Sequence, residues 1–377
     1  MKRVKRIAVT CLCMAVVMGA VRPGEAAEAK EKAPLIQMAI LLDTSGSMSG
    51  LIAQAKTQLW SIVNEFATTK RDGKVPEFQV ALYEYGKSSI PASENYLRMI
   101  VPLSTDLDKV SEELFALRTN GGQEYCGTVI QASVEGLAWS KSNDDFKAIF
   151  IAGNEPFTQG KVDYRAACKK AIENGIVVNT IHCGSYDVGV NTKWKDGAVI
   201  ADGTYTHIDQ NRAVVHVNAP QDKEILRLNA ELNKTYVPYG ARGLASAARQ
   251  KKQDANSKGV SGATLATRVA AKSSVHYRNA AWDLVDALRD GKVELEKLKE
   301  ADLPENMKKM SPEERKQHVE EQQKKRAELQ KKVRDLTDAR KKFVAAEMKK
   351  RGKAEGGTLG AAMLKAVRAQ AAKKNFK

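Results

Sequence analysis

The sequence lacks most of the features that mark enzymes and membrane proteins. It has no His-Glu-x-x-His spacing for a catalytic zinc ion, no Gly-x-Ser-x-Gly elbow for a serine nucleophile and no Gly-x-x-x-x-Gly-Lys loop for a phosphate. Beyond residue 21, no apolar run approaches the roughly 20 residues that a membrane-spanning helix needs. We therefore expect a protein that is not an enzyme and that has no membrane span after its first apolar stretch.

The amino terminus has the three parts of a secretory signal. Residues 1–6 are basic, residues 7–21 are apolar, and small residues at 24–26 or 27–29 offer a cleavage site. We predict that residues 1–29 form a signal peptide and that the chain is exported, to the periplasm or to the outer side of the cell envelope. A retained membrane anchor is the alternative, which the short apolar part and the cleavage site disfavour.

Cysteine is scarce, and the predicted signal contains two of the five cysteines. Export permits a disulfide among Cys126, Cys168 and Cys183, and an odd count leaves at least one thiol unpaired or in an intermolecular bond. Cys126 and Cys183 are expected at the same edge of a sheet, whereas Cys168 lies in a predicted helix. Two alternatives stay open: a disulfide between Cys126 and Cys183, or three reduced and buried thiols.

Charge is distributed unevenly along the chain. Residues 1–240 hold 27 basic and 27 acidic side chains, whereas residues 241–377 hold 34 and 18, so the last third carries the whole net charge of +16. Such a region is drawn to acidic surfaces. We expect it to bind an acidic envelope polymer, lipid headgroups or an acidic protein. Nucleic acid is not expected, because of export and because Phe343 is the only aromatic residue in the long helix predicted there.

Apolar runs alternate with amphipathic segments over the first two thirds of the chain. Runs at 36–42, 78–83, 146–151 and 176–181 are typical of strands buried on both faces, as in a parallel sheet. Segments with apolar residues at three- and four-residue steps separate these runs and predict helices. The run at 98–103, which contains a proline, predicts an edge strand. This order predicts an α/β fold with a doubly wound, mostly parallel sheet.

The composition changes after residue 238. The sequence therefore predicts five regions: a signal peptide at 1–29, an α/β domain at 34–238, a linker at 239–272, a basic helical hairpin at 273–351 and a basic tail at 352–377. The linker prediction rests on the flexible stretch 257–262.

A long basic helix is expected within the predicted hairpin, starting at Ser311-Pro312 with acidic residues in its first turn. Leu329, Val333 and Leu336 form a narrow apolar stripe along it, which needs a partner. The segment around Trp282 would supply that partner in an antiparallel hairpin. Self-association as a coiled coil is the alternative, and the oligomeric state stays open.

The most distinctive stretch is Asp43-Thr44-Ser45-Gly46-Ser47, which directly follows the first apolar run. It lies between a predicted strand and a predicted helix, and open α/β sheets bind ligands at the edge where such loops gather. Asp-x-Ser-x-Ser at this place resembles the von Willebrand factor type A (vWA) domain. The resemblance implies a doubly wound α/β domain, a metal-ion-dependent adhesion site with Mg²⁺ or a similar ion on the upper edge of the sheet, and a protein partner whose acidic side chain completes the coordination.

The sequence departs from the vWA pattern at two other ligand positions. The family has a threonine after a Gly-Gly pair, but Gln123 and Glu124 follow Gly121-Gly122 here, and Gly153 replaces an aspartate past the fourth main strand. We hypothesise that Asp43, Ser45, Ser47 and Glu124 hold a divalent cation, Mg²⁺ above all, through the oxygen ligands that hard cations require. The alternative is that Asp43 and the serines only cap the first helix and bond to the loop backbone.

These observations favour a protein-recognition or adhesion-type module at the cell envelope, with a partner docked at a divalent cation. A metal-independent vWA scaffold that works through its basic helices is the alternative. A cysteine hydrolase that uses Cys126 and His182 is the least favoured interpretation, because no third residue to orient them is identifiable.

Overall fold

The computed structural model describes residues 33–66, 69–350 and 357–376, and its core is a sheet of six strands. The strands are β1 (Leu35–Asp43), β2 (Glu77–Tyr85), β3 (Leu97–Ser104), β4 (Phe146–Gly153), β5 (Val177–Cys183) and β6 (Tyr205–Ile208). Their order is β3-β2-β1-β4-β5-β6, and only β3 runs antiparallel to its neighbour. The predicted α/β fold with a doubly wound, mostly parallel sheet is confirmed.

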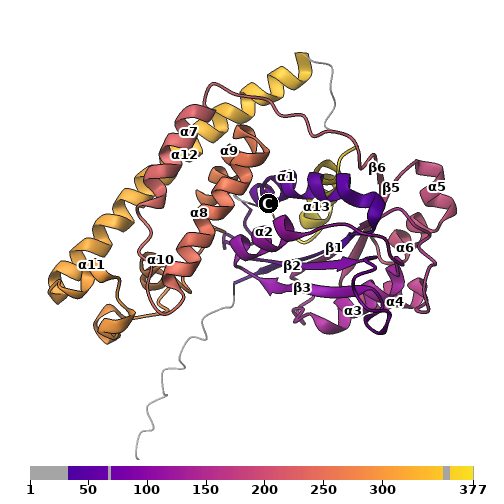
Figure 1. Ribbon diagram of the computed structural model, residues 1–377, viewed down its shortest axis with the longest axis horizontal. Coiled ribbons are helices and arrows are strands. Elements are labelled where there is room, and N and C mark those ends of the chain that lie inside the picture. Colours follow the sequence, from indigo (N-terminus) through magenta and orange to yellow (C-terminus); the bar gives the residue numbers. More distant parts are fainter. Residues whose placement is uncertain (1–32, 67–68, 351–356, 377) are drawn as a thin grey trace, which may run out of the picture. The chain divides into compact units, whose positions relative to one another are not determined.

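Helices cover both faces of the sheet, because alternate residues of each buried strand point to opposite sides (Figure 1). One face packs against α1 (Ser49–Glu65), α2 (Leu107–Ala116) and α13 (Leu359–Lys373), and the other against α3 (Cys126–Gly136), α4 (Tyr164–Glu173) and α6 (Trp194–Ile200). In β1, for example, Ile40 faces the first set and Leu41 the second. The central strands are thus buried on both faces, as their apolar runs predict.

The polar region 189–203 contains the second half of α5 (Tyr186–Asn191) and all of α6. Both helices are too short to show a clear periodicity. Trp194 holds α6 in place, because its ring is buried against Phe157 and its indole nitrogen donates to the carbonyl oxygen of Glu155 over 2.8 Å.

The second part of the described chain is helical. Its elements are α7 (Asp222–Asn233), α8 (Gly243–Val260), α9 (Gly262–Lys272), α10 (Leu284–Arg289), α11 (Glu305–Lys308) and α12 (Pro312–Lys350), with single 3₁₀ turns at Leu295–Lys297 and Glu300–Asp302. Two further 3₁₀ turns, at Gly46–Met48 and Ala92–Glu94, lie in the α/β part. No helix among the described residues is both long and apolar enough to cross a membrane.

The linker predicted at 239–272 is wrong, because α8 and α9 fill nearly all of it. The buried face of α8 is polar, with Gln250, Gln253 and Asp254 inside, so it carries no apolar stripe that the sequence would show. Arg268 and Lys272 of α9 are also fully buried. A helix that buries amides and charges therefore looks like a linker in the sequence.

The basic hairpin predicted at 273–351 has only one long arm, α12. The other arm is replaced by α10, α11 and short turns. The apolar stripe of α12 packs within the chain, and its Val333 is fully buried in the main core. Beside the stripe, Arg326 forms ion pairs with Asp283 over 2.5 Å and with Asp286 over 3.1 Å. The stripe's partner is thus not a second long helix but several short elements.

The segment predicted as a basic tail at 352–377 contains α13, which packs against α1 and the sheet. Leu359, Met363 and Ala366 are buried there in the main core. Gln54 of α1 accepts the backbone N–H of Leu359 over 2.8 Å, and so ties the start of α13 to the α/β domain. The signal predicted at 1–29 lies outside the described residues.

Gln370 joins α13 to β5 through a reciprocal amide pair with Asn179, in which the side-chain distances are 3.1 and 2.6 Å. We expect Gln370→Ala to lower the free energy of unfolding by about 2 kcal/mol, because the buried side-chain NH2 group of Asn179 would lose its acceptor. Urea unfolding measures this. Lys373→Ala, at an exposed position of the same helix, is the control and is expected to have little effect. Equal effects of the two variants would contradict the docking of α13.

The three cysteines of the described chain are free and buried. Cys126 lies in the core on one face of the sheet, and Cys183 lies in the core on the other. The disulfide between them, one of the two alternatives, is therefore not present. The sheet itself separates the two thiols.

Candidate metal centre

The upper edge of the sheet, where the parallel strands end, holds the Asp43–Ser47 loop between β2 and β4. Asp43 is the last residue of β1 and pairs in register with Tyr85 of β2. The backbone N–H of Thr44 donates to the Tyr85 carbonyl over 2.8 Å, and the Thr44 carbonyl accepts from the Asn120 N–H over 3.1 Å. The loop is thus fastened on two sides at the point where β1 passes into α1.

Asp43 is a buried carboxylate with one oxygen unpaired. Its side chain is 0 % exposed. Oδ1 accepts from the backbone N–H of Ser45 over 2.7 Å, whereas Oδ2 has no hydrogen-bond partner among the described residues. Burial raises the pKa of Asp43 to about 7, and the charges of Glu124 and Glu155 add to this effect. A bond to the loop backbone therefore explains the position of Oδ1 but not the burial of Oδ2.

The structure brings the other three predicted ligands to Asp43. The Ser45 side chain lies next to the Glu124 carboxylate, and Ser47 Oγ lies 3.5 Å from Ser45 Oγ at an exposed position. Glu124 is buried, and its backbone N–H donates to the Gln159 side chain over 2.7 Å. Burial, and then the nearby charge of Glu155, raise the pKa of Glu124. Two carboxylates that both resist ionisation therefore lie side by side.

Gly86 keeps the space between these carboxylates open. It follows β2 with a φ of +80°, a conformation that favours glycine. A Cβ atom at this position would lie 2.8 Å from Asp43 Oδ1 and 2.8 Å from Glu124 Cγ. No motif in the sequence marks Gly86 as a site residue. A glycine directly after a buried strand, next to the loop of the motif, is the signal that could have found it.

The donor set fits a hard divalent cation. An unpaired carboxylate oxygen, a second carboxylate and two hydroxyls are oxygen ligands of the kind that Mg²⁺ takes together with water. Asp43, Ser45, Ser47 and Glu124 would hold such an ion. No group of three or more His, Cys, Asp or Glu side chains in the described part of the chain is arranged to hold a metal. A site here would thus depend on the serine hydroxyls.

Tyr85 gives a physical reason for the glycine at 153. A Cβ atom on Gly153 would lie 2.5 Å from the Tyr85 hydroxyl and 3.1 Å from Asp43 Oδ2. The hydroxyl is fixed there because it donates to the Ala152 carbonyl over 3.0 Å. The phenol of Tyr85 therefore takes up the room that the family's aspartate side chain would need.

We expect Gly153→Ala to lower the free energy of unfolding by about 1–3 kcal/mol through overpacking against Tyr85. Tyr85→Phe removes the oxygen that the new methyl group would meet. The double variant should therefore lose less than the sum of the two single losses in urea unfolding. Additive losses would show that Tyr85 is not what excludes a side chain at 153.

Cys126 and His182 do not form an activated pair. Cys126 Sγ donates to the Tyr85 hydroxyl over 3.9 Å, and burial raises the pKa of this thiol well above its usual range. Neither ring nitrogen of His182 has a hydrogen-bond partner among the described residues, and the ring packs against Trp194 at 5.7 Å between centroids. The geometry gives Cys126 no base and keeps it protonated.

Comparison with known proteins gives partial structural matches. No protein-family model and no curated protein matches the sequence. The VWA domain of SpRpn10 is 19% identical, with 46% of this chain and 88% of that chain covered and a TM-score of 0.35. BatB from Bacteroides thetaiotaomicron is 14% identical, with 52% and 97% covered and a TM-score of 0.35. Proximal thread matrix protein 1 from the mussel byssus is 11% identical, with 46% and 42% covered and a TM-score of 0.32.

The strand order and the motif of this chain together characterise its α/β part. The central strand β1 lies between β2 and β4, and β3 alone is antiparallel, at one edge. The Asp-x-Ser-x-Ser segment begins at the carboxyl end of β1 and leads into α1. This strand order, together with Asp43, Ser45 and Ser47 at the end of the central strand, identifies the α/β part of the chain as a von Willebrand factor type A-like domain.

Proposed function

We propose that this chain is an exported protein-recognition module that docks a partner at a divalent cation on the upper edge of its vWA-like domain. The observation that carries the proposal is the unpaired Oδ2 of Asp43, a fully buried carboxylate oxygen beside Glu124 and the serine hydroxyls. A buried polar atom without a partner is costly, and a bound cation would supply that partner. Protein recognition is the general role of vWA-type domains.

Each residue would have a distinct part in such a site. Asp43 would supply a buried negative charge, Ser45 and Ser47 neutral oxygens, and Glu124 a second carboxylate in place of the family's threonine. A bound Mg²⁺ would supply an electrophilic centre for an acidic side chain of the partner. The second carboxylate lowers the net positive charge of the site, so the partner's acid would be held less strongly than in a site with one carboxylate.

Calorimetric titration of the full chain with Mg²⁺, Mn²⁺ and Ca²⁺ at pH 8, where Asp43 is ionised, tests the cation site. We expect binding of one ion and its loss in Glu124→Gln. Glu94→Gln, at an exposed turn outside the site, is the matched control and should bind as the unchanged chain does. An absence of heat with all three ions at millimolar concentration would leave the metal-independent scaffold as the function.

A pull-down from an envelope extract, with and without a chelator, tests partner docking. Capture that disappears in chelator and returns on addition of the cation is the expected result. Capture that is unchanged by the chelator but weakens steeply as salt is raised would instead indicate that the basic helices bind the partner. The lysines of α12 at 324, 325, 331, 332, 341 and 342 are exposed, while Arg326 and Arg340 are engaged in ion pairs.

A further inference from the structure

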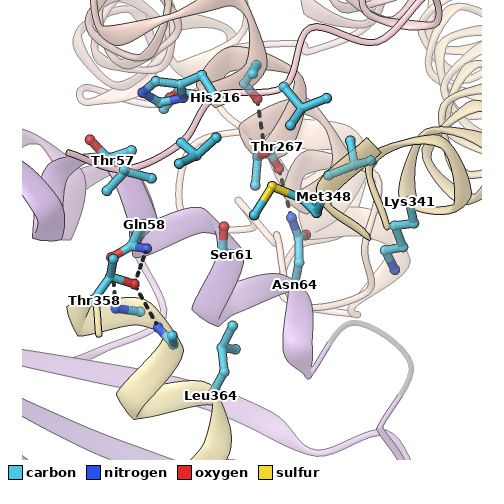
Figure 2. Close-up of a pocket in the computed structure, with 18 of the residues that line it drawn as sticks. Thr57, Gln58, Ser61, Asn64, His216, Thr267, Lys341, Met348, Thr358 and Leu364 are labelled. Carbon is cyan, nitrogen blue, oxygen red and sulfur yellow. Dashed lines mark hydrogen bonds between the residues drawn. The ribbon is translucent and has the colours of Figure 1, made fainter. Parts of the chain in front are cut away.

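A cavity lies between α1, α9, α12, α13 and the segment 212–217, away from the Asp43 loop. Its volume is about 500 Å³, within the range of about 300–1,000 Å³ that small-molecule sites occupy. Figure 2 shows Gln58 and Ser61 of α1 on one side of it, with Lys341 and Met348 of α12 across the cavity. Neither the proposed cation site nor the proposed docking surface uses these residues.

The floor and walls of the cavity are rich in hydroxyl and amide groups. The polar residues that line it come from α1, α9 and α12 and from the N-cap of α13: Thr57, Gln58, Ser61, Asn64, Thr264, Thr267, Thr337 and Thr358. Several of them are already satisfied, since Asn64 donates to the Thr267 carbonyl over 2.8 Å and Gln58 donates to Thr358 Oγ1 over 3.0 Å (Figure 2). Thr337 Oγ1, in contrast, is buried without a partner among the described residues. The cavity therefore offers an unused hydrogen-bonding group.

The charge around the cavity is strongly positive. Four cationic side chains line it, Arg212, Arg340, Lys341 and Arg368, and Glu65 is the only acidic lining residue among those that the structure describes. Glu65 is engaged with Arg368 over 2.8 Å, and Arg340 is engaged with Asp222 over 2.6 Å.

Arg212 and Lys341 are the cations available to a ligand. Within the described part of the chain, no ion pair or side-chain hydrogen bond involves the Arg212 guanidinium or the Lys341 ammonium group, and both side chains are exposed. Arg212 lies in the segment that follows β6, and Lys341 lies in α12. Two cations at one cavity, neither of them paired with another described residue, attract an anionic group.

One part of the lining is apolar. Val215, Val344, Met348 and Leu364 contribute aliphatic and thioether surface from three different elements. Such a surface favours a hydrocarbon group over a fully hydrated ligand. A methionine adapts its shape to irregular ligands. The cavity thus combines cations, hydroxyls and an apolar wall.

We propose that this cavity binds an amphiphilic anion, a small molecule with a phosphate or carboxylate head and a short hydrocarbon part. Arg212 and Lys341 contact the head, the hydroxyls of the lining donate to it, and the Met348 wall takes the hydrocarbon part. A free ligand of this kind and the headgroup of an anionic lipid share this chemistry.

Calorimetry of the full chain with octyl phosphate, octyl glucoside and inorganic phosphate, each as monomers in solution, tests the proposal. We expect octyl phosphate to bind at least about tenfold more tightly than either of the others, because only it satisfies both the cations and the apolar wall. The double variant Arg212→Gln/Lys341→Gln should reduce the preference over octyl glucoside to less than about threefold.

Lys342→Gln is the matched control, since Lys342 is the next residue of α12, is exposed and does not line the cavity. It removes one positive charge and should leave the preference unchanged. Equal binding of octyl phosphate and octyl glucoside, an absence of binding, or equal losses in the Lys342 and double variants would overturn the proposal.

Flotation with phosphatidylglycerol or phosphatidylcholine vesicles distinguishes the two sources of the anion. Flotation with phosphatidylglycerol alone, reduced in the double variant but not in Lys342→Gln, would assign a lipid headgroup. Octyl phosphate binding without flotation would assign a free amphiphile. Both outcomes support the cavity, and neither depends on a cation at Asp43.

Discussion

Arg268→Ala is expected to lower the free energy of unfolding by about 3–5 kcal/mol, because each of two buried carboxylates loses an ion-pair partner. The guanidinium is 0 % exposed. It bonds to Asp108 of α2 over 2.7 Å and to Asp254 of α8 over 2.7 Å, and it stacks over the Trp60 ring at 4.5 Å. A single side chain of α9 thus joins the helical part to the α/β domain.

Urea unfolding of the full chain measures this loss. Arg278→Ala is the matched control. The Arg278 side chain is 49% exposed, so its ion pair with Asp290 should contribute little to stability. Arg268→Met keeps most of the packing volume but not the charge. If the two carboxylates are the cause, Arg268→Met should lose nearly as much as Arg268→Ala. A loss below about 1 kcal/mol for Arg268→Ala would contradict a fixed contact between α9 and the domain.

The strands could be predicted from the sequence because their burial is visible in it. Apolar runs at 36–42, 78–83 and 146–151 are typical of strands that are buried on both faces. The structure has β1, β2 and β4 at these places, with bounds that differ by a few residues at most. The edge strand predicted at 98–103 is β3, and its proline lies where a missing donor is tolerated.

The helices α8 and α9 could not be predicted, because polar contacts replace apolar ones in their buried faces. Lys272 shows the difficulty: it is fully buried, and its ammonium group lies 2.8 Å from the Asn229 side-chain oxygen and 3.1 Å from an Asp254 oxygen. No one-dimensional pattern identifies such partners. The docking of α13 was also missed, because small residues such as Ala362 and Ala366 pack closely without forming a strong apolar stripe.

The candidate site was predicted in part, because one half of it is contiguous in the sequence. Asp43, Ser45 and Ser47 lie in five residues, and the structure places Glu124 beside them as the sequence suggested. Tyr85 and Gly86 were missed, because their role comes from the pairing of β2 with β1. The absence of an aspartate at 153 is explained only when the Tyr85 hydroxyl is seen beside it.

Asp43→Asn is expected to have opposite effects on stability and on cation binding. In chelator at pH 8 it should raise the free energy of unfolding by up to about 4 kcal/mol, since each unit between two pKa values corresponds to ~1.4 kcal/mol. The reason is that burial raises the pKa of Asp43 from 3.8 to about 7, so its ionised form destabilises the folded chain. The same substitution removes the charge that a divalent cation needs.

The contribution of Asp43 to the stability of the folded chain decreases as the pH rises. Between about pH 4 and 7 the folded state binds more protons at Asp43 than the unfolded state does, so the contribution of this group to stability is full below pH 4 and is lost as the pH rises through 7. In chelator, the stability of the unchanged chain should therefore fall over this range more steeply than that of Asp43→Asn. Cation binding should show the reverse, strengthening as the pH rises through 7, because the proton and the ion compete for the same carboxylate.

Urea unfolding at several pH values, with chelator and with millimolar Mg²⁺, separates these effects. Mg²⁺ should stabilise the unchanged chain, since a ligand that binds only the folded state adds to its stability, and it should not stabilise Asp43→Asn. Asp145→Asn is the control at the opposite edge of the sheet, where that buried carboxylate accepts from the Leu35 N–H over 2.9 Å. It should lose stability and keep its response to Mg²⁺. If Asp43→Asn instead destabilises the chain in chelator, Asp43 is a structural cap, and the unpaired oxygen has no function in binding a cation.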